Sequence, residues 1–92
     1  MATKRVEAIV SGRVQGVGFR YFAAHVADRL GVVGTVRNTH DGQIEAVVEG
    51  DEEALGRFLA ELRKGPAKAE VTGLHTSWSD AGGEFSKFEA IS

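Results

Sequence analysis

The chain has 92 residues, of which 42% are hydrophobic and 26% are charged, as expected for a soluble globular protein in which residues 1–92 form one domain. Its net charge of −2 creates no long-range field that favours general binding of nucleic acid, so we expect no nucleic-acid partner. The absence of cysteine excludes disulfides, iron–sulfur clusters, thiolate metal sites and phosphatase chemistry with a cysteine nucleophile.

No apolar run approaches the length that spans a membrane. The first residues lead into an alternating pattern and not into the apolar core of a secretion signal. We therefore expect a cytosolic protein without a membrane partner. Nothing in the sequence demands self-association, and we expect a monomer.

The first half of the chain predicts a strand, a helix and a hairpin. Residues 4–13 alternate apolar and polar side chains, which is the pattern of a half-buried strand. Apolar residues from 22 to 30 recur at helical spacing, and Gly31 suits the C-terminal cap of a helix. Short strands over residues 32–38 and 43–49 flank an Asp-Gly turn signal, so they are predicted to pair antiparallel.

The second half predicts a helix between two further strands. Asp51 is predicted to cap a helix whose apolar stripe ends at Leu62. A strand over residues 70–78, a glycine-containing loop and a short strand over residues 85–91 follow.

The order βαββαβ with an additional terminal strand is that of an α+β, ferredoxin-like α/β sandwich. Right-handed crossovers place both helices on one face of a mostly antiparallel sheet, with the first and third strands in its centre. This fold carries many unrelated activities, so it assigns no function.

Residues 11–20 form a glycine-rich turn that leads into the first predicted helix. The first backbone N–H groups of a helix have no intrahelical acceptor, and glycines allow neighbouring N–H groups to converge on one ligand. Arg20 falls in the first helical turn, where the helix dipole disfavours a cation. A guanidinium that binds phosphate or carboxylate explains this position, so the stretch predicts an anion site.

Two nucleotide-binding motifs and one RNA-binding motif do not match this stretch. The residues after Gly18 lack the third glycine of a dinucleotide-binding turn, and the stretch lacks the Gly-Lys-Ser/Thr of a P-loop. The aromatic residues that follow have helical spacing, unlike those of an RNA-recognition strand.

Residues 11–20, Ser-Gly-Arg-Val-Gln-Gly-Val-Gly-Phe-Arg, resemble the phosphate-binding signature of the acylphosphatases. Residues 34–44, Gly-Thr-Val-Arg-Asn-Thr-His-Asp-Gly-Gln-Ile, resemble the second signature of that family. Thr35 replaces the usual aromatic residue and Ile44 the usual valine. The resemblance covers essentially the whole chain.

This resemblance implies hydrolysis of an acyl phosphate to a carboxylate and inorganic phosphate, without a metal or another cofactor. Arg20 would bind the phosphate and Asn38 would orient the attacking water. The remaining residues predicted to bind phosphate through their backbone N–H groups, or to support the site, are Gln15, Gly16, Val17, Gly18 and Phe19, with Gly12 and Thr39 in support. Inorganic phosphate or sulfate would bind the same loop as a product-like ligand.

Such a small set of groups is sufficient for this reaction. A carboxylate leaves without a proton, and in a loose phosphoryl-transfer transition state positioning and charge stabilisation dominate. An asparagine is no base near neutral pH, so its role is orientation, and the proton of the water can pass to a phosphate oxygen.

Several residues also have structural interpretations. Arg20 could form a surface ion pair with Asp28 or Glu49, and Asn38 could be a simple turn residue. His40 is interpreted as an exposed turn residue and not as a base. Phe19 and Phe22 are interpreted as core anchors of the first helix, and Glu45, Glu49 and Glu70 as solvated strand residues.

A second functional class stays open on the sequence alone. An acylphosphatase-like module without catalysis could keep the anion cradle for regulation or for recognition of a partner. Intact Arg20 and Asn38 favour the enzyme.

Overall fold

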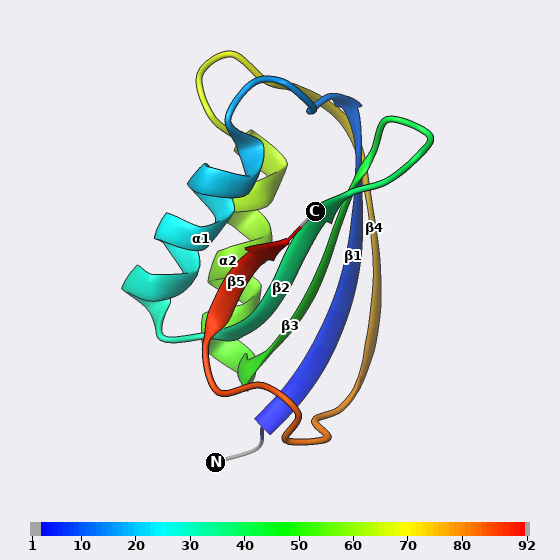
Figure 1. Cartoon of the computed structure of the whole chain (residues 1–92). Coiled ribbons are helices and arrows are strands. Elements are labelled where there is room, and N and C mark those ends of the chain that lie inside the picture. Colours follow the sequence, from blue (N-terminus) through cyan, green and yellow to red (C-terminus); the bar gives the residue numbers. More distant parts are fainter. Residues whose placement is uncertain (1–2, 92) are drawn as a thin grey trace.

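The computed structural model describes residues 3–91, in which five strands and two helices follow the predicted order (Figure 1). The strands are β1 (Thr3–Arg13), β2 (Val33–Asn38), β3 (Ile44–Asp51), β4 (Glu70–Asp80) and β5 (Phe88–Ile91). The helices are α1 (Phe19–Leu30) and α2 (Glu52–Lys64). The strand β5 begins three residues later than predicted, at Phe88 instead of residue 85, and β4 continues to Asp80.

The sheet has the strand order β4-β1-β3-β2-β5. The three ladders among β4, β1, β3 and β2 are antiparallel, whereas β5 pairs parallel with β2. The predicted ferredoxin-like arrangement is confirmed, with β1 and β3 between the other strands. The short strand β5 extends the sheet beyond β2, so residues 88–91 lie beside the strand that carries Asn38.

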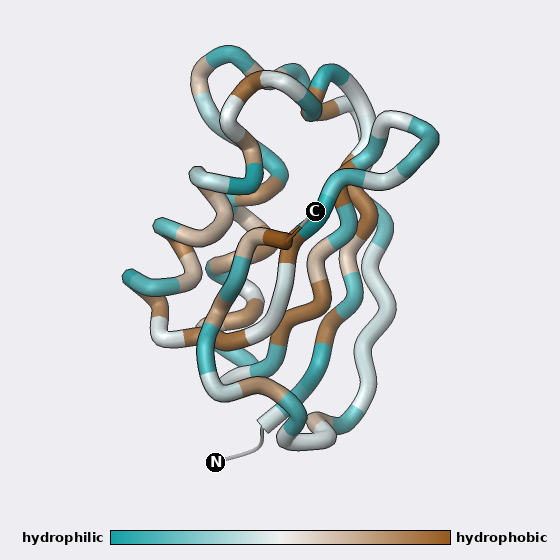
Figure 2. The backbone as a smooth tube through the Cα atoms, in the orientation of Figure 1, coloured by the Kyte–Doolittle hydropathy of each residue, from teal (hydrophilic) through white to brown (hydrophobic). Residues whose placement is uncertain are grey.

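Both helices cover the same face of the sheet, as predicted (Figure 1). Brown and teal residues alternate along several of the strands in Figure 2, because every second side chain faces the helices. The largest fully buried side chains are Phe19, Phe58, Ile44, Leu55, Leu62, Val6, Val10, Val14, Val26, Val36 and Val48. The ring of Phe19 packs edge-on against Phe22, with 5.9 Å between ring centroids, which confirms that these two phenylalanines anchor α1.

The helix ends agree with the prediction in part. Gly31 has a left-handed conformation (φ 73°), and its N–H donates to the carbonyl of Ala27, so it caps α1. Asp51 occupies the N-cap position of α2, but its side chain makes no capping hydrogen bond. The predicted side-chain cap is therefore wrong, and the strand β3 continues through Asp51 directly into the helix.

The prediction that Glu49 is solvated is also wrong. Its side chain is 3% exposed, and its carboxylate accepts hydrogen bonds from Nε and Nη2 of Arg5 at 2.9 and 2.8 Å. The backbone N–H groups of Gly82 and Gly83 donate to the same carboxylate at 3.1 and 3.2 Å. Glu84 pairs with Arg5 as well. These contacts fasten the connection between β4 and β5, drawn in orange in Figure 1, to the central strands.

The other two acidic strand residues have different surroundings. Glu70 is exposed, as predicted. Glu45 is half-buried, and its carboxylate accepts a hydrogen bond from Nε of Arg37 on the neighbouring strand at 2.7 Å. An alternating pattern places all three acidic residues on a strand, but it does not reveal which of them a later segment covers.

Replacing Glu49 with alanine is expected to lower the free energy of unfolding by about 2 to 3 kcal/mol, because two backbone N–H groups lose their acceptor and Arg5 loses one of its two carboxylate partners. Burial raises the pKa of the Glu49 carboxyl, but the hydrogen bonds from Arg5, Gly82 and Gly83 outweigh burial and hold the pKa below its ordinary value of 4.5. The ionised carboxylate therefore stabilises the fold above pH 4.5, and this contribution is lost as the pH falls through the folded-state pKa.

Urea unfolding of the wild-type and Glu49→Ala proteins, at neutral pH and at about pH 3, measures both effects. The two proteins should differ clearly at neutral pH and less in acid. Glu53→Ala is the control, because it removes an exposed pair with Arg57 and is expected to change stability by less than about 1 kcal/mol. The same difference at both pH values would contradict the assigned role of the ionised carboxylate.

No helix within residues 3–91 is long and apolar enough to cross a membrane. The cytosolic location stays a prediction.

Candidate active site

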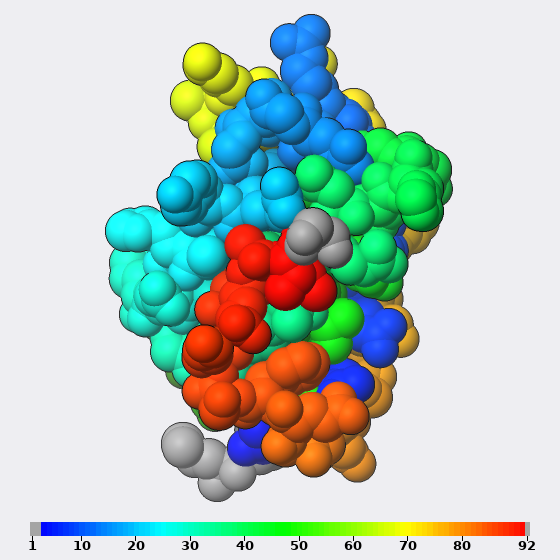
Figure 3. All heavy atoms as spheres, in the orientation of Figure 1, coloured from blue at the N-terminus to red at the C-terminus, as the bar shows by residue number. Residues whose placement is uncertain are grey.

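A pocket of about 300 Å³ lies where the start of α1, the end of β2 and the end of β5 meet. In Figure 3 the light blue, green and red surfaces of these segments adjoin in the upper half of the molecule. The residues that line the pocket are Val14, Gly16, Gly18, Phe19, Arg20, Tyr21, Asn38 and Ala90. The pocket thus joins residues that stand far apart in the sequence.

The backbone of the glycine-rich turn forms one wall of this pocket. Gly18 is the N-cap of α1 with a left-handed backbone (φ 78°), and Gly16 has φ 73°. A glycine offers only backbone to its surroundings, so peptide groups form the surface at these two positions. The N–H of Phe22 donates to the carbonyl of Gly18 at 3.0 Å, which is the first bond of the helix. The N–H groups before Phe22 have no acceptor within the helix and suit an anion.

Arg20 supplies the charge of the pocket. It lies in the first turn of α1, as predicted, and is half-buried. Its Nη1 donates to the carbonyl of Ile91 on β5 at 2.9 Å, and within residues 3–91 it forms no ion pair, neither with Asp28 nor with Glu49. Among the described residues that line the pocket it is the only one with a charged side chain, so the pocket favours an anion.

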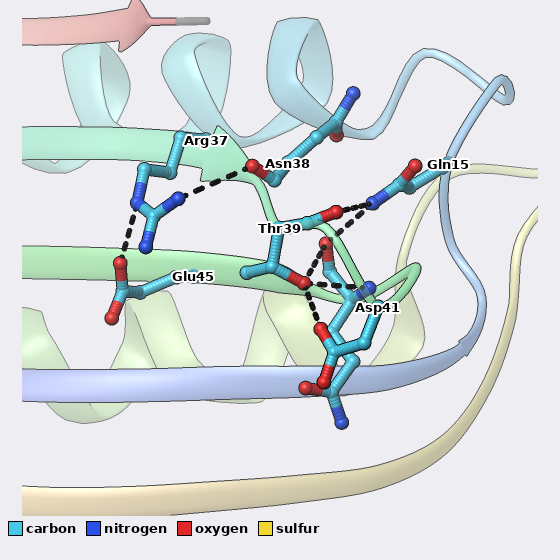
Figure 4. A network of polar contacts seen from close by, with 7 residues as sticks. Gln15, Arg37, Asn38, Thr39, Asp41 and Glu45 are labelled. Carbon is cyan, nitrogen blue, oxygen red and sulfur yellow. Dashed lines mark hydrogen bonds and ion pairs between the residues drawn. The ribbon is translucent and has the colours of Figure 1, made fainter.

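Asn38 lies at the end of β2 and is half-buried. Its backbone carbonyl accepts a hydrogen bond from Nη1 of Arg37 at 3.4 Å. In Figure 4 the side chain of Asn38 points away from this contact, toward the start of α1. No described residue forms a hydrogen bond with its amide group, which is therefore available to a water molecule or a ligand in the pocket.

Gln15 connects the glycine-rich turn to the turn that follows β2. Its Nε2 donates to the backbone carbonyls of Thr39 and Gln43, both at 2.9 Å (Figure 4). The hydroxyl oxygen of Thr39 accepts a hydrogen bond from the N–H of Gln43 at 3.0 Å, and the hydroxyl donates to the carboxylate of Asp41. These two bonds close the turn. Nε2 of Gln43 donates to Oγ of Ser11 at 2.9 Å. These bonds fix the segment that carries Asn38 relative to the segment that carries Arg20.

Gly12, Gln15, Val17 and Thr39 do not line the pocket, although the sequence predicts them to bind or support a phosphate. Gly12 lies in β1 at an irregularity of its pairing with β4, where a Cβ atom would come within 2.1 Å of the carbonyl oxygen of Glu70. This close approach of two strands requires a glycine at position 12. The phosphate roles of these four residues stay predictions.

Sequence reasoning did not single out Val14, Tyr21 and Ala90 as site residues, although they line the pocket. Val14 is buried and continues the apolar face of β1 toward the loop. Tyr21 follows Arg20, so its place in the first helical turn was a usable signal. Ala90 reaches the pocket only because β5 pairs with β2, and no local pattern reveals that pairing.

The three histidines, His25, His40 and His75, are exposed and lie outside the pocket, which confirms the prediction that His40 is an exposed residue. Within residues 3–91 no group of three or more histidine, aspartate or glutamate side chains is placed to hold a metal ion.

A family model described as Acylphosphatase matches residues 6–90 of the chain. An acylphosphatase of Methylococcus capsulatus is 48% identical over 88 residues, which are 96% of this chain and 96% of that protein. The chain belongs to the acylphosphatase family. An acylphosphatase of Anaeromyxobacter dehalogenans is 47% identical over 85 residues, which are 92% of this chain and 91% of that protein.

The fold supports the same assignment. The crystal structure of acylphosphatase from Bacillus subtilis superposes on this chain with a TM-score of 0.94 at 36% sequence identity. The matched region comprises 97% of this chain and 99% of the Bacillus subtilis chain. Acylphosphatases are hydrolases that act on acid anhydrides, so the chain is an enzyme of this class.

Proposed function

We propose that the pocket hydrolyses small acyl phosphates without a metal ion. Arg20 and the backbone N–H groups of residues 15–19 hold the phosphoryl group, and the amide of Asn38 orients the attacking water. The observation that supports this proposal is that Arg20, from a helix, and Asn38, from a strand, line one pocket with the glycine backbone. Among residues 3–91 no other charged side chain lines it.

The reaction needs one bond to form and one to break. The oxygen of the water attacks phosphorus while the bond from phosphorus to the acyl oxygen breaks, and the electron pair of that bond leaves with the carboxylate. Because a carboxylate is stable without a proton, no general acid is required. The charge that develops on the phosphoryl oxygens meets the guanidinium of Arg20 and the N–H groups at the start of α1.

The proton of the attacking water passes to a phosphoryl oxygen. Within residues 3–91, no aspartate, glutamate or histidine lines the pocket, so none of the described side chains there is a conventional base. The expected consequence is a kcat that is flat through the neutral pH range. A basic limb that disappears in a His40→Ala variant would contradict this route.

Hydrolysis of acetyl phosphate by the purified chain, measured as release of inorganic phosphate with and without EDTA, tests the proposed function. Equal rates with and without the chelator are expected. A rate that falls with EDTA and returns with an added divalent cation would contradict metal independence. No hydrolysis, combined with binding of inorganic phosphate, would favour a binding module without catalysis.

A further inference from the structure

The pocket has more room and more kinds of surface than a phosphate ion requires. Its volume of about 300 Å³ lies at the lower end of the range for pockets that hold small organic molecules. Arg20, Asn38 and the glycine backbone account for its polar part. Tyr21 on α1 and Ala90 on β5 line the same pocket, and both are exposed.

Tyr21 is unusually exposed for a large side chain. It is 88% exposed, against 44% for Trp78 and 38% for Ile91, the other exposed large hydrophobic residues within residues 3–91. Trp78 does not line this pocket. The ring of Tyr21 packs on little of its own protein, so most of its surface is available to a ligand beside Arg20. An aromatic ring gains stabilisation when another flat apolar group packs against it.

The single positive charge of the pocket determines which acyl groups fit beside the phosphoryl group. The guanidinium of Arg20 is required by the phosphoryl group, and in the described part of the chain no other lining residue carries a positive side chain. A second carboxylate on the acyl group would therefore lie without a counter-ion among Tyr21, Ala90 and peptide groups. This part of the pocket is open to solvent, so such a carboxylate keeps its water but gains neither a counter-ion nor the packing that an aromatic acyl group gains on the ring of Tyr21.

We propose that Tyr21 and Ala90 form the binding site for the acyl group, and that Tyr21 gives the enzyme a preference for uncharged aromatic acyl groups over small or anionic ones. This proposal rests on the proposed function, because it assigns the non-phosphoryl half of the same substrate. Tyr21 is the specificity-determining residue, and it takes no part in the chemical step.

The test compares kcat/KM for benzoyl phosphate, acetyl phosphate and succinyl phosphate in the wild-type and Tyr21→Ala proteins. The ratio of benzoyl to acetyl phosphate is expected to fall about three- to tenfold in Tyr21→Ala, chiefly through KM. Tyr21→Phe keeps the ring and is expected to keep the ratio. Trp78→Ala removes an exposed aromatic residue on β4 and is the matched control. A ratio within twofold of wild type in Tyr21→Ala would overturn the proposal.

A binding measurement separates this proposal from the proposed function. Benzylphosphonate and methylphosphonate carry the same charged end and cannot be hydrolysed at the carbon–phosphorus bond. Tighter binding of benzylphosphonate by the wild type, lost in Tyr21→Ala and kept in Tyr21→Phe, supports the acyl-group site even if none of the acyl phosphates is hydrolysed. Equal affinities in all three proteins would overturn the acyl-group site, even if the wild type hydrolyses acetyl phosphate.

Discussion

Replacing Arg20 with alanine is expected to lower kcat/KM for acetyl phosphate by at least about 10³-fold. The guanidinium is the only charged side-chain group that residues 3–91 contribute to the pocket, so its removal leaves the phosphoryl charge to backbone N–H groups. The affinity for inorganic phosphate is expected to fall as well. The loss in stability is smaller, about 1 kcal/mol, because the side chain makes one hydrogen bond to the carbonyl of Ile91.

Two further variants make this prediction specific. Arg20→Lys keeps the charge but loses the planar pair of donors, and it is expected to recover only a small part of the activity. Arg29→Ala removes an exposed arginine from the other end of the same helix, where it pairs with Glu61, and it is expected to hydrolyse acetyl phosphate at the wild-type rate. Substantial activity in Arg20→Ala would contradict the assignment of Arg20 to the phosphoryl group.

The parts of the fold that follow from local periodicity were predictable. The alternation of β1 and the helical spacing of α1 and α2 identify the elements, because burial of one face imposes these periods on the sequence. The left-handed glycine at position 31 ends α1 where the sequence predicts. The predicted capping hydrogen bond of Asp51 is absent. An aspartate before a helix indicates where the helix begins, but it does not determine the rotamer of the side chain.

Features that depend on one segment covering another were not predictable. Glu49 looks like any other solvent-facing position of a strand, and only the path of residues 81–84 across its end buries the carboxylate. Ala90 has no signal of its own, because its place in the pocket follows from the parallel pairing of β5 with β2. Such contacts depend on tertiary structure, and a window along the sequence does not contain them.

The residues of the candidate site differ in how far the sequence predicts their roles. The prediction that residues 11–20 bind an anion follows from glycines at a helix start and an arginine in the first turn, and the structure places both there. No pattern in the residues around Asn38 assigns it a role by itself; the resemblance to the acylphosphatases does. The structure contributes the meeting of the two segments and the bonds of Gln15 that join them.

Replacing Asn38 with alanine is expected to lower kcat by about 10² to 10³-fold while the inhibition constant of inorganic phosphate changes little. The amide holds no partner among the described residues, and its proposed task is to orient a water molecule, which affects the chemical step and not the binding of the anion. Asn38→Asp adds a negative charge to the pocket and is expected to weaken phosphate binding as well.

Gln15→Ala distinguishes the effect of misplacing the amide of Asn38 from the effect of removing it. This variant keeps the amide of Asn38 and the backbone N–H at position 15, but it removes both hydrogen bonds to the carbonyls of Thr39 and Gln43. A misplaced amide orients water poorly, so kcat is expected to fall by about tenfold, less than in Asn38→Ala. If Asn38 is only a turn residue, Asn38→Ala will keep wild-type turnover and lose stability instead. The comparison of kcat with the free energy of unfolding across the two variants decides between orientation of water and a structural turn.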